Sequence, residues 1–135
     1  MITRAEFVGG RFLYAVEVDT SQGFELCPAD ICAVGEANCP VGEAPSAKFR
    51  IVEGVPQSLR KRIERFLAAN GVEIAGVEFI ADTAGRLLVY DVNTNTNYNA
   101  EAEAREGCAG TSRSGAGAIA QFLEVELEQL QAEAA

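Results

Sequence analysis

Residues 76–99 read GVEFIADTAGRLLVYDVNTNTNYN, two apolar runs joined by the tetrapeptide DTAG and followed by a run rich in Asn and Thr. Asp in the first position and Gly in the fourth is the preferred pattern of a type I turn. The two runs are therefore predicted to pair as an antiparallel hairpin. Glu78 interrupts the first run, and Asp91 and Asn93, two residues apart, share one face of the second strand.

The register of this hairpin depends on the length of its turn. A two-residue turn at Thr83-Ala84 would place Glu78 opposite Val89 and make Asp91 its diagonal neighbour on the same face, within roughly 7–8 Å. A loop one residue longer would move Glu78 to the other face, because side chains alternate along a strand. The sequence predicts the two-residue turn.

Two carboxylates and one amide oxygen on a common face suit a hard cation. Mg²⁺ and Mn²⁺ bind a few protein oxygens and complete their shells with phosphates and water. Glu78, Asp91 and Asn93 are therefore candidate metal ligands. Ordinary surface acids of a hairpin would give the same spacing, so spacing alone leaves both interpretations open.

The rest of the chain predicts a single α+β domain over residues 1–135, with an antiparallel sheet and two main helices. Leu59, Ile63, Phe66 and Leu67 recur at helical spacing, and Asn70-Gly71 is a typical helix end. The expected order begins with a hairpin within residues 5–27 that turns at residues 9–10, a long loop at 27–47, a short strand at 49–52 and a helix from about 56 to 70. Strands at 73–81 and 86–93 and a final helix from Gly115 follow. The final helix has an apolar stripe of Ile119, Phe122, Leu123, Leu127 and Leu130.

The overall charge excludes several functions. Twenty acidic residues against 11 basic ones give a net charge of -9, which disfavours nucleic acid or an anionic membrane as partner. No apolar run approaches the roughly 18 residues of a membrane span, and no signal peptide is visible, so a cytoplasmic location is expected. One basic cluster is predicted to be a solvent-exposed helix face: Arg60, Lys61, Arg62 and Arg65.

Histidine and cysteine usage narrows the chemistry further. The chain has no histidine, which excludes Ser-His-Asp catalysis and every His-ligated metal site. The spacings of Cys27, Cys32, Cys39 and Cys108 match neither redox CxxC motifs nor zinc ribbons. Reduced structural thiols are expected, and a metal or disulfide cluster at Cys27, Cys32 and Cys39 is the alternative.

The hairpin resembles the signature of the ATP-grasp superfamily. The runs AGVEFI at residues 75–80 and VYDVN at 89–93 match an acidic residue on one strand and an acid-x-Asn triplet at the end of the next. The likeness is to glutathione-synthetase-like enzymes and to ligases that add glutamate to ribosomal protein tails. By position, the resemblance implies that Glu78 binds one Mg²⁺ (or Mn²⁺), Asp91 bridges two and Asn93 completes the second, with ATP as cosubstrate.

The likeness extends beyond the hairpin but is not complete. Residues 2–10 resemble the strand pair that begins the second ATP-grasp subdomain, where an arginine often faces the phosphates. Arg4 is the candidate, with Arg50 behind it. Asp91 replaces the more usual Glu, and residues 94–99 replace a Ser-Pro-Gly turn. This Asn/Thr segment either faces the acceptor substrate or is a turn whose side chains cap their own backbone.

The resemblance implies the carboxy-terminal, metal- and phosphate-binding half of a carboxylate–amine (or carboxylate–thiol) ligase that acts through an acylphosphate on small-molecule carboxylate and amine substrates. In that superfamily the nucleotide-clamping half lies upstream, so this chain is expected to be inactive alone. The alternative is a non-catalytic binding or assembly module that forms a homodimer through exposed sheet edges.

Overall fold

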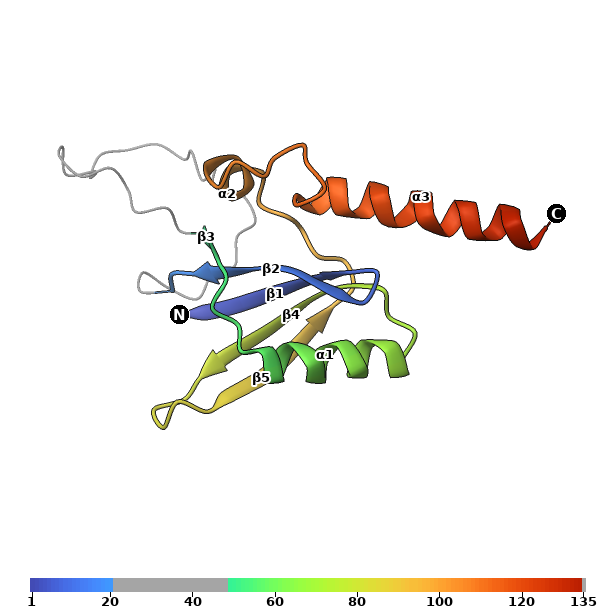
Figure 1. The fold of residues 1–135 in the computed structure, drawn as a ribbon. Helices are drawn as coiled ribbons and strands as arrows, with labels where there is room; N and C mark the ends of the chain where they lie inside the picture. Colours follow the sequence, from blue (N-terminus) through green and yellow to red (C-terminus); the bar gives the residue numbers. More distant parts are fainter. Residues whose placement is uncertain (21–48, 135) are drawn as a thin grey trace.

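The computed structural model describes residues 1–20 and 49–134. A five-stranded antiparallel sheet, in the order β3-β2-β1-β4-β5, forms its centre (Figure 1). The elements are β1 (Ile2–Val8), β2 (Arg11–Val18), β3 (Phe49–Val52), α1 (Gln57–Ala69), β4 (Ile74–Ala81), β5 (Leu87–Asn93), α2 (Ala100–Arg105) and α3 (Gly115–Glu133). This arrangement confirms the predicted α+β class with an antiparallel sheet. The predicted loop at residues 27–47 lies outside the described residues.

Local sequence signals account for the ends of several elements. Gly9 and Gly10 both have positive φ, 59° and 68°, as the tight turn between β1 and β2 requires. Helix α1 ends at Asn70, whose backbone N–H bonds Phe66 O at 3.2 Å, and Gly71 follows at φ 63°. A glycine in this left-handed conformation is the common way to stop a helix.

Helix α1 covers one face of the sheet, as Figure 1 shows. Its inward residues Leu59, Ile63 and Leu67 are buried and pack against alternate residues of β1 and β4. Leu67 is completely buried, so truncating it to Ala would cost about 2–5 kcal/mol of stability. The buried strand residues in this core are Ala5, Phe7, Ala15, Ala75, Val77 and Phe79.

The opposite face of the sheet is partly apolar and partly polar. Near β3 it carries a second buried cluster to which Ala102 of α2 contributes, with Ile2, Tyr14, Val16, Val18 and Phe49 from the sheet. Toward β4 and β5, the same face carries Arg4, Glu6 and Glu78 in place of apolar side chains. This half of the sheet is where the candidate ligands lie.

Four expectations about the helices need correction. Helix α2 was not predicted, although Asn99 caps it by accepting a 2.7 Å hydrogen bond from Ala102 N–H. Arg60 is half-buried, because its guanidinium carbon lies 4.7 Å from the centre of the Phe12 ring. Phe66, which its spacing placed in the apolar stripe of α1, is 52% exposed. The stripe of α3 is also largely open, since Leu123, Leu127 and Leu130 are 56%, 55% and 62% exposed.

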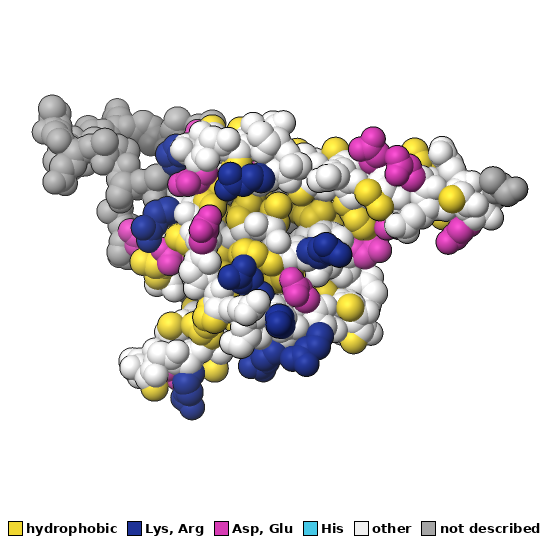
Figure 2. All heavy atoms as spheres, viewed as in Figure 1, with side chains coloured by type: hydrophobic (Ala, Val, Ile, Leu, Met, Phe, Trp, Pro, Cys, Tyr) yellow, Lys and Arg dark blue, Asp and Glu magenta, His cyan; other side chains and the backbone are white. Residues whose placement is uncertain are grey.

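Charge is distributed unevenly over the helices. Figure 2 shows Lys and Arg side chains gathered over α1 and Asp and Glu side chains along α3. Within the described part of the chain, no helix is both long and apolar enough to cross a bilayer.

Candidate functional site

The β4–β5 hairpin differs from the predicted one in two places. Gly85 N–H bonds Asp82 O at 2.9 Å, which confirms the β-turn, but Asp82 N–H bonds Arg86 O at 2.9 Å. The loop therefore has one residue more than predicted, with Gly85 at φ 76°. A type I turn followed by a left-handed glycine is a common three-residue hairpin connection. The predicted two-residue turn at Thr83-Ala84 is wrong.

A β-bulge in β5 compensates for the longer loop. Phe79 pairs with Val89, whereas Glu78 pairs with Asp91, so Tyr90 is the extra residue. Without the bulge, the longer loop would have placed Glu78 opposite Tyr90 and turned Asp91 to the α1 face. The two irregularities together make Glu78 and Asp91 direct cross-strand neighbours rather than diagonal ones.

Three strands combine into a small grid on the face opposite α1. In one row Arg4 of β1 pairs with Glu78 of β4, which pairs with Asp91 of β5. In the next row Glu6 pairs with Gly76, which pairs with Asn93. Residues directly opposite each other in an antiparallel pair point to the same face. The structure therefore brings four of the five predicted site residues together.

Arg50 is the predicted residue that lies elsewhere. It follows Phe49, which packs in the cluster with Val16 and Val18 on the grid's face of the sheet. Alternation along β3 turns Arg50 to the other face, where it forms an ion pair with Glu17. The predicted catalytic role of Arg50 stays a prediction that this geometry does not support.

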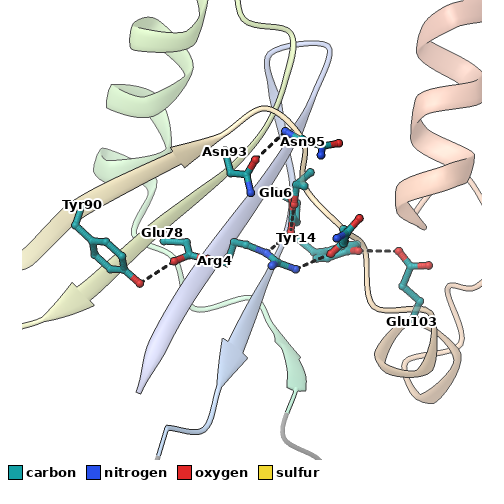
Figure 3. Close-up of polar contacts among 10 residues, drawn as sticks. Arg4, Glu6, Tyr14, Glu78, Tyr90, Asn93, Asn95 and Glu103 are labelled. Carbon is teal, nitrogen blue, oxygen red and sulfur yellow. Dashed lines mark hydrogen bonds and ion pairs between the residues drawn. The ribbon is translucent and has the colours of Figure 1, made fainter. Parts of the chain in front are cut away.

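The carboxylates of the grid differ in their surroundings. Glu78 is 7% exposed, and its Oε2 accepts a 2.8 Å hydrogen bond from the Tyr90 hydroxyl (Figure 3). Partial desolvation of the Tyr90 hydroxyl, and then this hydrogen bond, raise the pKa of Tyr90 well above its usual range. Asp91 and Asn93 are exposed. The Asn93 side-chain oxygen accepts a 2.8 Å hydrogen bond from Asn95 N–H.

Arg4 is bound to Glu6 rather than to Glu78. Its Nε donates to Glu6 Oε1 at 2.6 Å, and its terminal nitrogen donates to Asn97 O at 2.7 Å. Glu6 is completely buried and also accepts from the Thr96 hydroxyl at 2.9 and 3.1 Å. Burial raises the pKa of Glu6, although the Arg4 guanidinium opposes that rise.

Gly76 makes room for these contacts. A Cβ at this position would lie 2.8 Å from Thr96 Oγ1, 3.1 Å from Glu6 Oε2 and 3.2 Å from Arg4 Cδ. The empty centre of the second row is thus filled by the side chains of Glu6 and Thr96. Those contacts tie residues 94–99 to the sheet.

A second buried carboxylate, Glu103 of α2, links β2 to the start of α3. Glu103 Oε1 accepts from the Tyr14 hydroxyl at 2.7 Å and from Gly115 N–H, at the start of α3, at 2.6 Å. The Tyr98 ring packs on Gly115, where an added Cβ would lie 2.1 Å from the ring. Among the described residues, the Tyr98 hydroxyl is the buried side-chain polar atom without a hydrogen-bond partner.

Sequence reasoning missed Glu6, Thr96 and Tyr90. Glu6 had a usable signal, because it lies two residues after Arg4 in a predicted strand and so shares its face. Thr96 and Tyr90 had none, since their positions depend on a bulge and on the path of residues 94–99 across the sheet. Both interpretations of that segment persist: its side chains do cap local backbone, and it also borders the grid.

The donor set fits a cation with an incomplete protein shell. Among the described residues, no three His, Cys, Asp or Glu side chains converge tightly enough to hold a metal by themselves. Two carboxylates and one amide oxygen leave most of an octahedral Mg²⁺ shell to phosphates and water, which is how Mg²⁺ is usually bound beside nucleotides. Cys108 is a buried free thiol that donates to Glu103 O at 3.4 Å; Cys27, Cys32 and Cys39 lie outside the described residues.

Comparison with known proteins finds solved structures with a similar fold. No protein-family model and no curated protein matches the sequence. Among solved structures, the chain is similar to the ATP-grasp ligase PsnB in complex with precursor peptide PsnA2 and AMPPNP, with a TM-score of 0.59 and 12% identity over 94% of this chain and 32% of that chain. The fold of this chain is similar to that of part of this ATP-grasp ligase.

Two further PsnB structures give the same result. The complex with a minimal precursor has a TM-score of 0.61, 12% identity and coverage of 94% of this chain and 36% of that one. The complex with a phosphomimetic variant of the minimal precursor, Mg and ADP has a TM-score of 0.56, 15% identity and coverage of 92% and 32%. The ATP-grasp resemblance predicted from the hairpin is confirmed at the level of the fold, and the chain spans about a third of the length of these ligase chains.

Proposed function

We propose that this chain is the metal- and phosphate-binding part of an ATP-dependent carboxylate–amine (or carboxylate–thiol) ligase. The observation that carries the proposal is the register that sets Glu78 directly opposite Asp91, with Arg4 at one end of the row and Asn93 in the next. The ATP-grasp fold supports it, and so do neighbours whose complexes contain AMPPNP, or Mg and ADP.

In this proposal the side chains have distinct tasks. Glu78, Asp91 and Asn93 would hold Mg²⁺ (or Mn²⁺), an ion that when bound would supply neutralisation of the charge on the γ-phosphoryl group. Arg4 presents a guanidinium beside them to orient the phosphates. The phosphoryl group is transferred to a substrate carboxylate, and the resulting acylphosphate loses phosphate when an amine or a thiol attacks.

The Asn/Thr-rich segment lies beside the grid on the sheet. Residues 94–99 border the grid and are tied to it through Thr96, so we assign them to the acceptor side. The PsnB neighbours are complexed with a precursor peptide, which is consistent with a peptide as well as a small-molecule substrate. Glutathione-synthetase-like chemistry and a cytoplasmic location remain part of the proposal.

The chain would supply part of the ligase active site and not the whole of it. Because the chain spans only 32–36% of the neighbouring ligase chains, ATP turnover by these 135 residues alone is not expected. Calorimetry with Mg-ATP on this chain and on a version extended upstream would test that division. Turnover by the extended protein that survives Asp91→Ala would contradict the metal assignment.

Metal binding can be tested on the chain itself. Titration with Mn²⁺, followed by electron paramagnetic resonance of the free ion, is expected to show a site that Asp91→Asn or Glu78→Gln weakens at least about tenfold. Asp82→Asn is the matched control, because Asp82 is an acid of the same hairpin whose carboxylate serves the turn. Equal weakening by Asp82→Asn would mean that the ion binds the acidic surface diffusely.

One observation favours a second candidate function. β5 is an edge strand of the sheet, and four of its large apolar or aromatic side chains are more than a third exposed: Leu88, Val89, Tyr90 and Val92. Such an edge invites pairing with another chain. A non-catalytic assembly module that dimerises here would show a concentration-dependent dimer in analytical ultracentrifugation and no Mn²⁺ site at Glu78 and Asp91.

A further inference from the structure

The orientation of Arg4 is unexpected for a residue placed beside two carboxylates. Arg4 and Glu78 are direct cross-strand partners, and opposite charges at such positions normally attract. Within the described part of the chain, however, the ion pair of Arg4 goes to Glu6 at 2.6 Å and not to Glu78 or Asp91. Its remaining contact, to Asn97 O at 2.7 Å, also points away from Glu78.

If the Arg4 side chain turned toward Glu78 or Asp91, it would block the proposed metal site. A guanidinium bound to Glu78 or Asp91 would occupy their oxygens and cancel the negative charge that attracts a cation. Glu6 offers Arg4 a better partner, since its carboxylate is completely buried and a second donor, Thr96, fixes it from the other side. Breaking this pair would leave a buried charge without its partner, which is costly.

We propose that Glu6 is a positioning residue that holds Arg4 off Glu78 and Asp91 and so leaves both carboxylates free for a divalent cation. This inference rests on the proposed metal site and deepens it. Figure 3 shows the arrangement: the Arg4 guanidinium extends toward Glu6 and residues 94–99, while the Glu78 carboxylate faces Tyr90. The guanidinium is thereby kept for the phosphates and does not compete with the metal.

The test is an Mn²⁺ titration of this chain and three variants, again by electron paramagnetic resonance. Glu6→Gln keeps the shape and an oxygen for Thr96 but loses the charge that holds Arg4, and it is expected to weaken Mn²⁺ binding about tenfold or more. Arg4→Met/Glu6→Gln removes the competing guanidinium as well. Its affinity is expected to return to within about threefold of the wild type, because the guanidinium that would occupy the carboxylates is gone. A simple change in local charge would give the same recovery, so the charge-conserving variant described next distinguishes the two causes.

Glu6→Asp covers the case in which Glu6→Gln does not fold. It keeps the negative charge but shortens the arm by one methylene, so Arg4 is released while the local field is retained. Several-fold weaker Mn²⁺ binding is expected, whereas wild-type affinity would overturn the inference. The folding of each variant is checked by circular dichroism and its melting temperature.

The outcomes separate the inference from the proposed function. Unchanged affinity in Glu6→Gln would refute the positioning role and leave the metal site standing. A double variant as weak as Glu6→Gln would also refute it, because the loss would then come from the charge of Glu6 rather than from Arg4. A wild-type chain that binds no Mn²⁺ would remove the metal site, and the inference with it.

Discussion

Replacing Gly76 by Ala is expected to destabilise the protein, against the usual trend for a strand. Glycine inside a strand is ordinarily worse than alanine by roughly 0.5–1 kcal/mol, because it loses more conformational entropy on folding. Gly76 has no positive φ that would explain its presence. The reason is space, since a Cβ here would lie 2.8 Å from Thr96 Oγ1, closer than real Cβ contacts come, and 3.1 Å from Glu6 Oε2.

The size of the effect follows from what has to move. Thr96 must shift, which strains or breaks its 2.9 Å hydrogen bond to the buried Glu6 carboxylate. A lost hydrogen bond costs about 0.5–1.5 kcal/mol and overpacking a tight site about 1–3 kcal/mol. Taking about 2–3 kcal/mol together, and about 4 °C per kcal/mol for a chain of this size, the melting temperature should fall by about 8–12 °C.

Gly54→Ala is the matched control. Gly54 has ordinary φ, and an added Cβ would meet no atom within 4 Å, so this change should be neutral or slightly stabilising. Thermal unfolding followed by circular dichroism compares the two variants under the same conditions. If Gly76→Ala melts within about 2 °C of Gly54→Ala, the crowding argument fails. Adding Thr96→Ala to Gly76→Ala should recover part of the loss, because it removes the closest contact.

Three further predictions test other parts of the structure. Gly115→Ala should destabilise the protein by about 1–3 kcal/mol or more, the range typical of overpacking, because its Cβ would lie 2.1 Å from the Tyr98 ring. A variant that melts like the wild type would refute that packing. Backbone and side-chain N–H donors of Arg86 hold the pKa of Asp82 below its usual 3.8. The difference in melting temperature between the wild type and Asp82→Ala should therefore be largest at pH 7 and shrink as pH falls below 3.8. Burial, and after it the nearby Glu6 carboxylate, raises the pKa of Tyr98 to about 12. Tyrosinate absorbance at 295 nm should therefore stay low at pH 11 in the folded protein and rise near pH 10 in urea. The stability contributed by keeping Tyr98 neutral should be lost between pH 10 and 12.

The fold could be predicted from sequence wherever a short local signal decides it. The Gly9-Gly10 turn and the Asn70-Gly71 end of α1 were confirmed, since each depends on a few neighbouring residues. The apolar spacing along α1 was confirmed for Leu59, Ile63 and Leu67, whereas Phe66 is exposed. Helix α2 was missed because six residues carry too little periodicity to distinguish a helix from a turn. Helix α3 was predicted correctly, but its apolar stripe does not reveal whether a partner covers it.

The candidate site was predictable in its residues but not in its geometry. The shared face of Glu78, Asp91 and Asn93 was inferred from a two-residue turn, which is wrong, and the grouping survives only because the bulge at Tyr90 cancels the longer loop. Neither irregularity has a reliable local signal. A bulge is set by how a strand meets the strands around it, and single-sequence periodicity carries no such information.

The grid on the sheet couples Gly76 and Glu6 to the positions of the candidate metal ligands. Register sets Glu6, Gly76 and Asn93 in one row, and a side chain at position 76 would collide with the side chains of Thr96 and Glu6. With no side chain there, Glu6 and Thr96 meet over the glycine, and Arg4 is drawn toward them and away from Glu78. In the proposed metal site, the availability of the two carboxylates therefore depends on a residue with no functional group, through a contact that a motif of the acidic positions alone would not reveal.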